Sequence, residues 1–134
     1  MQLGTLSGNS IAAVAGLKTM EILARPGQYD RLRANGQAIR EAACEALDAV
    51  GVPYRIVGDP TLFEIVFTER EVCNYRDTIQ VNRGRADAYQ SALRENGVSK
   101  SPGKAYPSLA LTEDDLEQVR QAIERAAGAA ASAS

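Results

Sequence analysis

The strongest constraint on the fold is a long amphipathic segment in the first half of the chain. From about residue 28 to residue 50, apolar side chains recur at steps of three, four or seven, and charged side chains fill other positions. This period predicts one helix with a single apolar face. The face comprises Tyr29, Leu32, Ile39, Ala43, Ala46, Leu47 and Val50. Such a face requires a second layer to pack against, and Gly51 is placed to end the helix.

Shorter elements predict that second layer. We expect strands over 54–57, 62–68 and 106–111, and further helices over 11–24, 84–96 and 113–126. Their order favours an α+β fold in which helices cover a small, mostly antiparallel sheet. By composition, residues 1–10 are a loop, residues 11–126 form the domain with its leading helix, and residues 127–134 form a disordered, Ala-rich tail.

Composition excludes several kinds of site and partner. The 134 residues contain no His, which removes Ser-His-Asp triads, Cys-His pairs and His-based metal sites. The chain has fifteen basic and seventeen acidic residues, and this near balance argues against nucleic-acid binding. The apolar stretch 11–17 is too short to cross a bilayer, and no signal-peptide pattern is present. We expect a cytoplasmic chain with no metal, nucleic-acid or membrane partner.

Few side chains suit catalysis, and none is assigned a catalytic role. Cys44 lies close to the apolar face of the long helix, which predicts a buried, inert thiol. Cys73 has no nearby base, and the two cysteines are expected to be reduced thiols, with a single disulfide as the alternative. The acidic run 113–115 follows Thr112 and is better explained as a helix cap than as a pair of catalytic carboxylates.

The loop 99–104 carries two lysines, Lys100 and Lys104. Lys18 is the only other lysine, and we expect it on a solvated helix face. Lys100 and Lys104 are expected to be solvated as well. Either one can still reach an anionic group if the loop borders a cleft, so both are candidate contacts for a substrate.

The segment from Gly4 to Asn9 has the composition of a ligand loop. A phosphate would be well bound here by backbone N–H groups that the glycines leave accessible, by the Thr5 hydroxyl and by the helix start just beyond. It is not a Walker loop, because no Gly-Lys-Ser/Thr follows. The alternative is a plain loop and helix cap.

The same segment, with the apolar helix after it, resembles the GTLSGNP-x-A-x-x-AG segment of class III aminotransferases. The glutamate-1-semialdehyde aminomutase-like branch has the most similar variant. Further matches follow in the family's order: 21–23, 29–32, 67–68, 74–77, 93–98 and 108–115. The resemblance covers nearly the whole chain apart from the tail.

This resemblance implies the small C-terminal domain of a fold-type I enzyme that uses pyridoxal 5′-phosphate (PLP). In this family Thr5 would bind the cofactor phosphate of the neighbouring subunit, supported by Gly4. The family's cofactor-binding lysine and its aspartate lie upstream and have no counterpart in these residues. The resemblance therefore implies amino-acid transamination or amino-group migration. It also implies that the chain is inactive alone and pairs with a large lysine-bearing PLP domain or forms a homo-oligomer.

Departures from the family pattern leave the substrate open. Ser10 replaces the family's Pro, Leu111 replaces a His, and the loop 99–105 is shorter than the usual aminomutase loop. A transaminase with another substrate fits as well as an aminomutase. One alternative is a stand-alone binding or regulatory module that keeps this fold without catalysis, and another is a gene remnant without function.

Overall fold

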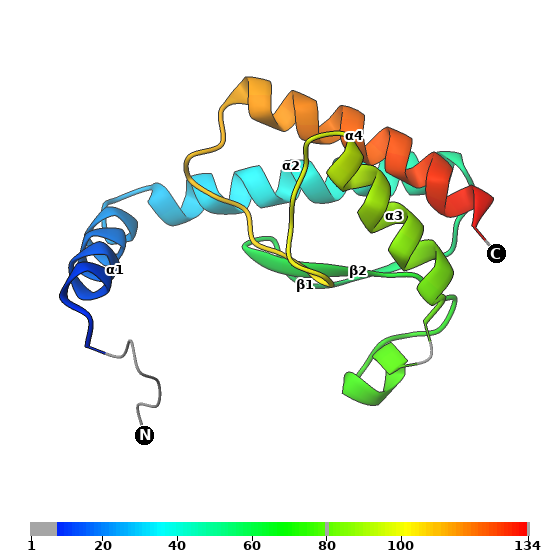
Figure 1. Ribbon diagram of the computed structural model, residues 1–134, viewed down its shortest axis with the longest axis horizontal. Helices are drawn as coiled ribbons and strands as arrows, with labels where there is room; N and C mark the ends of the chain where they lie inside the picture. The colour runs from blue at the N-terminus through cyan, green and yellow to red at the C-terminus, as the bar shows by residue number, and fades with distance from the viewer. Residues whose placement is uncertain (1–7, 80, 134) are drawn as a thin grey trace. The chain divides into compact units, whose positions relative to one another are not determined.

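The computed structural model describes residues 8–79 and 81–133 (Figure 1). Its elements are α1 (Ser10–Leu23), α2 (Gln28–Ala49), β1 (Arg55–Asp59), β2 (Leu62–Val66), the 3-10 helix η1 (Tyr75–Ile79), α3 (Arg83–Glu95), β3 (Lys104–Ala105) and α4 (Glu113–Ser132). The α+β prediction is confirmed. The chain divides into two compact units, Met1–Arg31 and Leu32–Ser134. No helix in the described ranges is long and apolar enough to cross a membrane.

The first unit contains α1, whose ends lie one residue before those of the predicted helix 11–24. The Asn9 side chain accepts a hydrogen bond from the backbone N–H of Ala12 at 3.1 Å and so caps the first turn. No residue of α1 is buried. Four of its large apolar side chains are exposed, Ile11, Val14, Leu17 and Met20, whereas Ile22 and Leu23 are half-buried. At 100° per residue, steps of three residues carry these four side chains halfway around the helix, so they spread over much of its surface.

The second unit is built on a three-stranded antiparallel sheet in the order β1-β2-β3. A two-residue turn joins β1 to β2, with Asp59 paired to Leu62. The Asp59 carboxylate accepts hydrogen bonds from the backbone N–H and the hydroxyl of Thr61, which closes this turn. The short β3 pairs Ala105 with Phe63 and Lys104 with Glu64.

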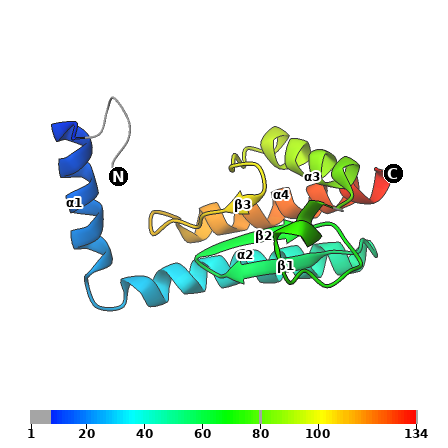
Figure 2. The ribbon, with the colours of Figure 1, turned by 90° about the horizontal axis from the view of Figure 1, so that it is seen from below.

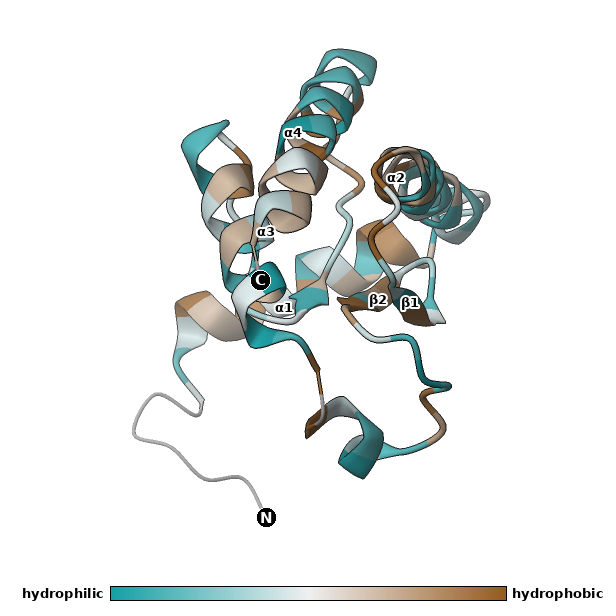
Figure 3. Ribbon diagram, turned by 90° about the vertical axis from the view of Figure 1, so that its right-hand side faces the viewer, coloured by the Kyte–Doolittle hydropathy of each residue, from teal (hydrophilic) through white to brown (hydrophobic). Residues whose placement is uncertain are grey.

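Three helices, α2, α3 and α4, lie on one face of this sheet (Figures 1 and 2). The core between the layers is mostly aliphatic, as expected for a chain with 5% aromatic residues. Its buried members are Ala43, Ala46, Leu47, Val52, Phe67, Tyr89, Ala92, Leu93, Ala122, Ile123, Ala126, Ala127 and Ala130. β1 and β2 are coloured as hydrophobic in Figure 3, whereas much of α4 is hydrophilic. The predicted ends of the long helix agree with α2 to within a residue.

The predicted strand over 106–111 is wrong, because β3 ends at Ala105. Continuing its register would pair Tyr106 with Leu62 and then place Pro107 opposite the turn, where no ladder remains. Proline also has no N–H to donate to a neighbouring strand. The segment is held by α2 instead, since the side-chain amide of Asn35 donates to the Ser108 carbonyl at 3.0 Å.

The predicted disorder of the Ala-rich tail is also wrong, because α4 continues to Ser132. Ala127 and Ala130 are fully buried in the core. Alanine has the highest helix propensity, and its small side chain permits close packing against neighbouring helices. The tail composition therefore suits a tightly packed helix end.

Candidate functional site

The candidate site is formed where the chain passes from α3 to β3. Gly97 adopts a left-handed conformation just beyond the end of α3, and Gly103 adopts one just before β3. In the loop between these two glycines, the backbone carbonyl of Lys100 accepts a hydrogen bond from the Gln90 side chain on α3 at 3.1 Å. The Lys100 ammonium donates to the carbonyls of Ser101 at 3.2 Å and Gly103 at 3.4 Å. The loop is thus fixed both by α3 and by its own lysine.

This loop closes one side of an apolar cavity of about 170 Å³ between the sheet and the helices. Among the described residues, Lys100 is the one charged member of its wall. The lining residues are Ile39, Phe63, Ile65, Tyr89, Leu93, Val98, Ser99, Lys100, Gly103, Ala105, Tyr106, Pro107, Ser108, Leu111, Val119 and Ile123. A mostly apolar cavity with few polar groups is the usual form of a small-molecule site.

A second cavity of about 130 Å³ shares Lys100 and Gly103 with the first, and its wall is more polar. Glu64, Thr78, Asp87 and Gln90 are among its lining residues. Loss of hydration lowers the pKa of Lys100, and the negative charge of Glu64 acts in the opposite direction. Lys100 therefore lies between an apolar and a polar space, in surroundings that weaken its hold on the proton.

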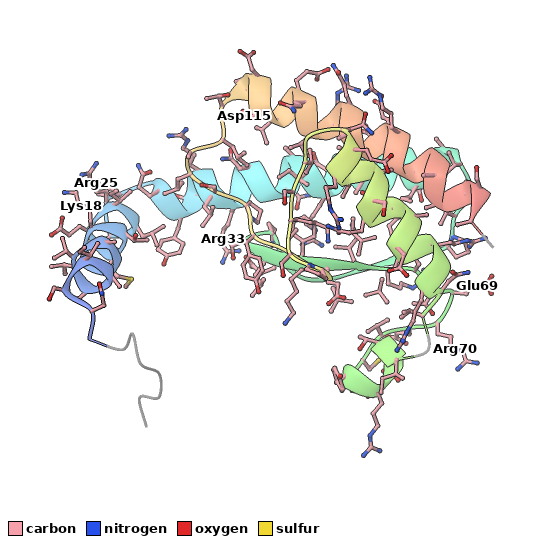
Figure 4. The ribbon with its side chains drawn as sticks, in the orientation of Figure 1. Lys18, Arg25, Arg33, Glu69, Arg70 and Asp115 are labelled. Atoms are coloured by element: carbon pink, nitrogen blue, oxygen red, sulfur yellow. The ribbon has the colours of Figure 1, made fainter. Side chains whose placement is uncertain are left out.

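The structure separates the two lysines that the sequence treats as equivalent. Lys100 is half-buried, so the expectation of a solvated side chain is wrong for it. Lys104 is exposed on β3 and lines neither of these cavities. Lys18 is exposed as predicted and pairs with Glu21 at 3.0 Å (Figure 4).

The proposed phosphate loop is described only at its end. Gly4 and Thr5 lie outside the described residues. Gly8 adopts a left-handed φ of 86°, and Asn9 then caps α1. The positive end of the α1 dipole therefore follows directly after the segment that contains Gly4 and Thr5.

The acidic run at the start of α4 is a helix cap, as predicted. Thr112 and Asp115 form a reciprocal capping box, with Asp115 in the first turn (Figure 4). Hydrogen bonds from the Thr112 backbone and hydroxyl hold the pKa of Asp115 below its usual range. Among residues 8–79 and 81–133, no group of three or more acidic or Cys side chains is arranged to hold a metal ion.

The exposed thiol, Cys73, is not poised for nucleophilic chemistry. No disulfide joins the two cysteines; Cys44 is half-buried rather than fully buried, and Cys73 is exposed. The negative charge of Glu71 raises the pKa of Cys73, with smaller contributions from loss of hydration and from Asp77. A raised pKa reduces the thiolate fraction and with it the reactivity.

Sequence reasoning missed the residues that hold the β1–β2 hairpin on α2. Arg33 reaches from α2 to the Asp59 carboxylate at 2.5 Å (Figure 4). Arg40 donates to the Gly58 carbonyl at 3.1 Å, and its guanidinium lies 5.8 Å from the centre of the Phe63 ring. These partners are 18 to 26 residues apart, so no local spacing could identify them. They position β2, whose residues Phe63 and Ile65 line the apolar cavity.

Comparison with curated proteins finds clear relatives. The chain is 35% identical over 124 residues to "Glutamate-1-semialdehyde 2,1-aminomutase 2" of Brevibacillus brevis, covering 90% of this chain and 29% of the relative. It is 30% identical over 133 residues to glutamate-1-semialdehyde 2,1-aminomutase of Natranaerobius thermophilus, covering 97% and 31%. The chain thus spans less than a third of the length of these relatives. No protein-family model matches it.

Solved structures agree in fold. An omega-transaminase from Sphaerobacter thermophilus superposes with a TM-score of 0.80 at 29% identity, over 97% of this chain and 30% of that chain. The PLP-containing FumI protein of Sphingopyxis sp. MTA144 gives a TM-score of 0.73 over 96% of this chain, with 22% identity. The first match extends the resemblance in both sequence and fold, and the second supports the fold alone.

Proposed function

We propose that this chain, which belongs by sequence and fold to the family of glutamate-1-semialdehyde aminomutases and PLP-dependent transaminases, serves as the C-terminal part of a class III aminotransferase. The observation that carries the proposal is the match of 90–97% of the chain to about 30% of such proteins. In this role it acts on an amino acid and a carbonyl compound within a cytoplasmic, dimeric assembly. The cofactor-binding lysine comes from outside these 134 residues.

Two residues of this chain would contact PLP. We assign the Thr5 hydroxyl and the Gly4 backbone to the cofactor phosphate, and the start of α1 at Ser10, a few residues further along the chain, supports this assignment. When bound, PLP supplies the electron sink for amino-group transfer. The chain itself would hold the phosphate, form one wall of the cleft and exclude water from it. It contributes no catalytic residue, and we expect it to be inactive alone.

The exposed apolar side chains of α1 support a role within a larger assembly. Ile11 is 82% exposed, and Val14, Leu17 and Met20 are each exposed by more than 60%. Four such side chains on one helix make an apolar surface that a partner would be expected to cover. We assign this surface to the large PLP domain or to a second copy of the protein.

The test is reconstitution with the lysine-bearing domain of a homologous aminomutase. PLP is titrated into this chain, into that domain and into their mixture, and visible absorption and transamination are followed. We expect a borohydride-reducible PLP band and activity in the mixture and neither with this chain alone. Thr5→Val should weaken PLP binding about tenfold, since a hydrogen bond to a charged group is worth roughly 1.5 kcal/mol or more.

Thr19→Val is the matched control, because Thr19 is exposed on α1 and its hydroxyl donates to the Ala15 carbonyl of the same helix. Its PLP affinity should equal that of the parent. A folded chain that associates with the domain yet gives no PLP band would favour the alternative, a non-catalytic binding or regulatory module. Equal PLP affinity of the Thr5 variant and the parent mixture would remove the phosphate assignment.

A further inference from the structure

We propose that Lys100 and the apolar cavity beside it form a binding site for a monocarboxylate whose apolar part is about the size of a benzene ring. The proposal needs neither PLP nor a second chain. It concerns the cavity between β2, β3, α3 and α4, which lies wholly within residues 39–123.

The charge of Lys100 is the first argument. Its side chain is half-buried, and none of the ion pairs in the described part of the chain includes it. An ammonium has three donors, and two of them have acceptors, the carbonyls at 3.2 Å and 3.4 Å. Both distances are at or beyond the long end of the hydrogen-bond range. One donor therefore remains for a ligand anion, which would bind by a charge-assisted hydrogen bond.

The apolar wall is the second argument. Phe63, Leu93 and Ile123 are buried core residues, and all three line the cavity. Its volume of about 170 Å³ can be compared with engineered apolar cavities, which stay dry and take up benzene at roughly 150 Å³. The space therefore fits a phenyl or short alkyl group, whose transfer from water is favourable.

The absence of a carboxylate from the cavity wall determines the kind of acid. Among the described residues that line it, Lys100 alone is charged. The Glu64 carboxylate, whose charge acts on Lys100, lines the second cavity instead. An α-ammonium group entering the cavity with the ligand would have no carboxylate partner there and would lose hydration. We therefore assign the site to acids without an amino group beside the carboxylate, rather than to amino acids.

The test is an NMR titration of the 134-residue chain with three ligands of the same apolar body: 3-phenylpropionate, 3-phenyl-1-propanol and phenylalanine. We expect 3-phenylpropionate to bind, with shifts of the Leu93 and Ala105 amides, and the other two to bind at least about tenfold more weakly. Tenfold corresponds to about 1.4 kcal/mol of binding free energy.

Three variants separate the contribution of the Lys100 charge from that of the apolar cavity. Lys100→Met should weaken 3-phenylpropionate binding about tenfold, whereas Lys104→Met, which removes the exposed lysine, should leave it unchanged. Ala105→Leu keeps Lys100 but fills the cavity, and it should abolish binding. Equal affinities for the acid and the alcohol would overturn the role of Lys100. Equal affinity for phenylalanine would overturn the exclusion of amino acids, and no binding of any ligand would overturn the site.

Discussion

Replacing Gly36 by Ala tests the contact between α2 and the β1–β2 hairpin. Gly36 is buried in the middle of α2, and a Cβ atom there would lie 1.9 Å from the Pro60 carbonyl oxygen and 3.2 Å from Cγ of Pro107. A backbone carbonyl cannot rotate away as a side chain can. The hairpin would have to retreat by about 1.5 Å to restore an ordinary contact of 3.4 Å.

The energetic cost follows from two opposing terms. Gly→Ala in a helix stabilises it by about 1 kcal/mol, whereas forcing extra volume into a packed site costs typically ~1–3 kcal/mol. We expect the cost at this site to lie at the upper end of that range, because a retreating hairpin also stretches the Arg33–Asp59 and Arg40–Gly58 contacts. We expect a net loss of about 2 kcal/mol, which lowers the Tm by roughly 10 °C for a unit of this size.

The assay is urea unfolding of the chain, followed by circular dichroism, with Gly128→Ala as the matched control. Gly128 is exposed in α4, and a Cβ atom added there would have no neighbouring atom within 4 Å. This variant should gain up to about 1 kcal/mol from helix propensity alone. If Gly36→Ala were as stable as the parent, or gained as much as Gly128→Ala, the close approach of Pro60 to α2 would be refuted.

Three further predictions concern α4, the hairpin turn and Cys73. Ala130→Asp buries an unpaired carboxylate and should cost several kcal/mol in urea unfolding, roughly 3 or more, whereas Ala131→Asp at the exposed neighbour should cost under about 1. Bonds from Thr61 and then Arg33 lower the pKa of Asp59 to about 2, so its contribution to stability is complete above about pH 4 and is lost as the pH falls through about 2. Thr61→Val should raise that pKa in an NMR titration, and an unmoved value would contradict the turn geometry. Glu71→Gln should lower the pKa of Cys73 and speed its reaction with a disulfide reagent at about pH 8.

Local patterns in the sequence predict the helices well, because their periods and caps depend on neighbouring residues. The stripe of α2, the Asn9 cap of α1 and the Thr112–Asp115 capping box all follow from positions within one or two turns. The prediction for the tail failed because its structure depends on packing rather than on a local pattern. Its Ala and Ser composition is equally typical of disorder, and only the packing of Ala127 and Ala130 into the core selects the helix.

The candidate site depends on contacts that no local pattern contains. The half-burial of Lys100 requires the Gln90 bond to its carbonyl and the pairing of β3 with β2. Because side chains alternate along a strand, that register places Ala105 in the wall of the apolar cavity and Lys104 on the opposite face, near Val57. A slip of one residue would exchange them and bring Lys104 to the cavity. The register of a two-residue strand therefore keeps Lys104 away from the cavity that Lys100 lines.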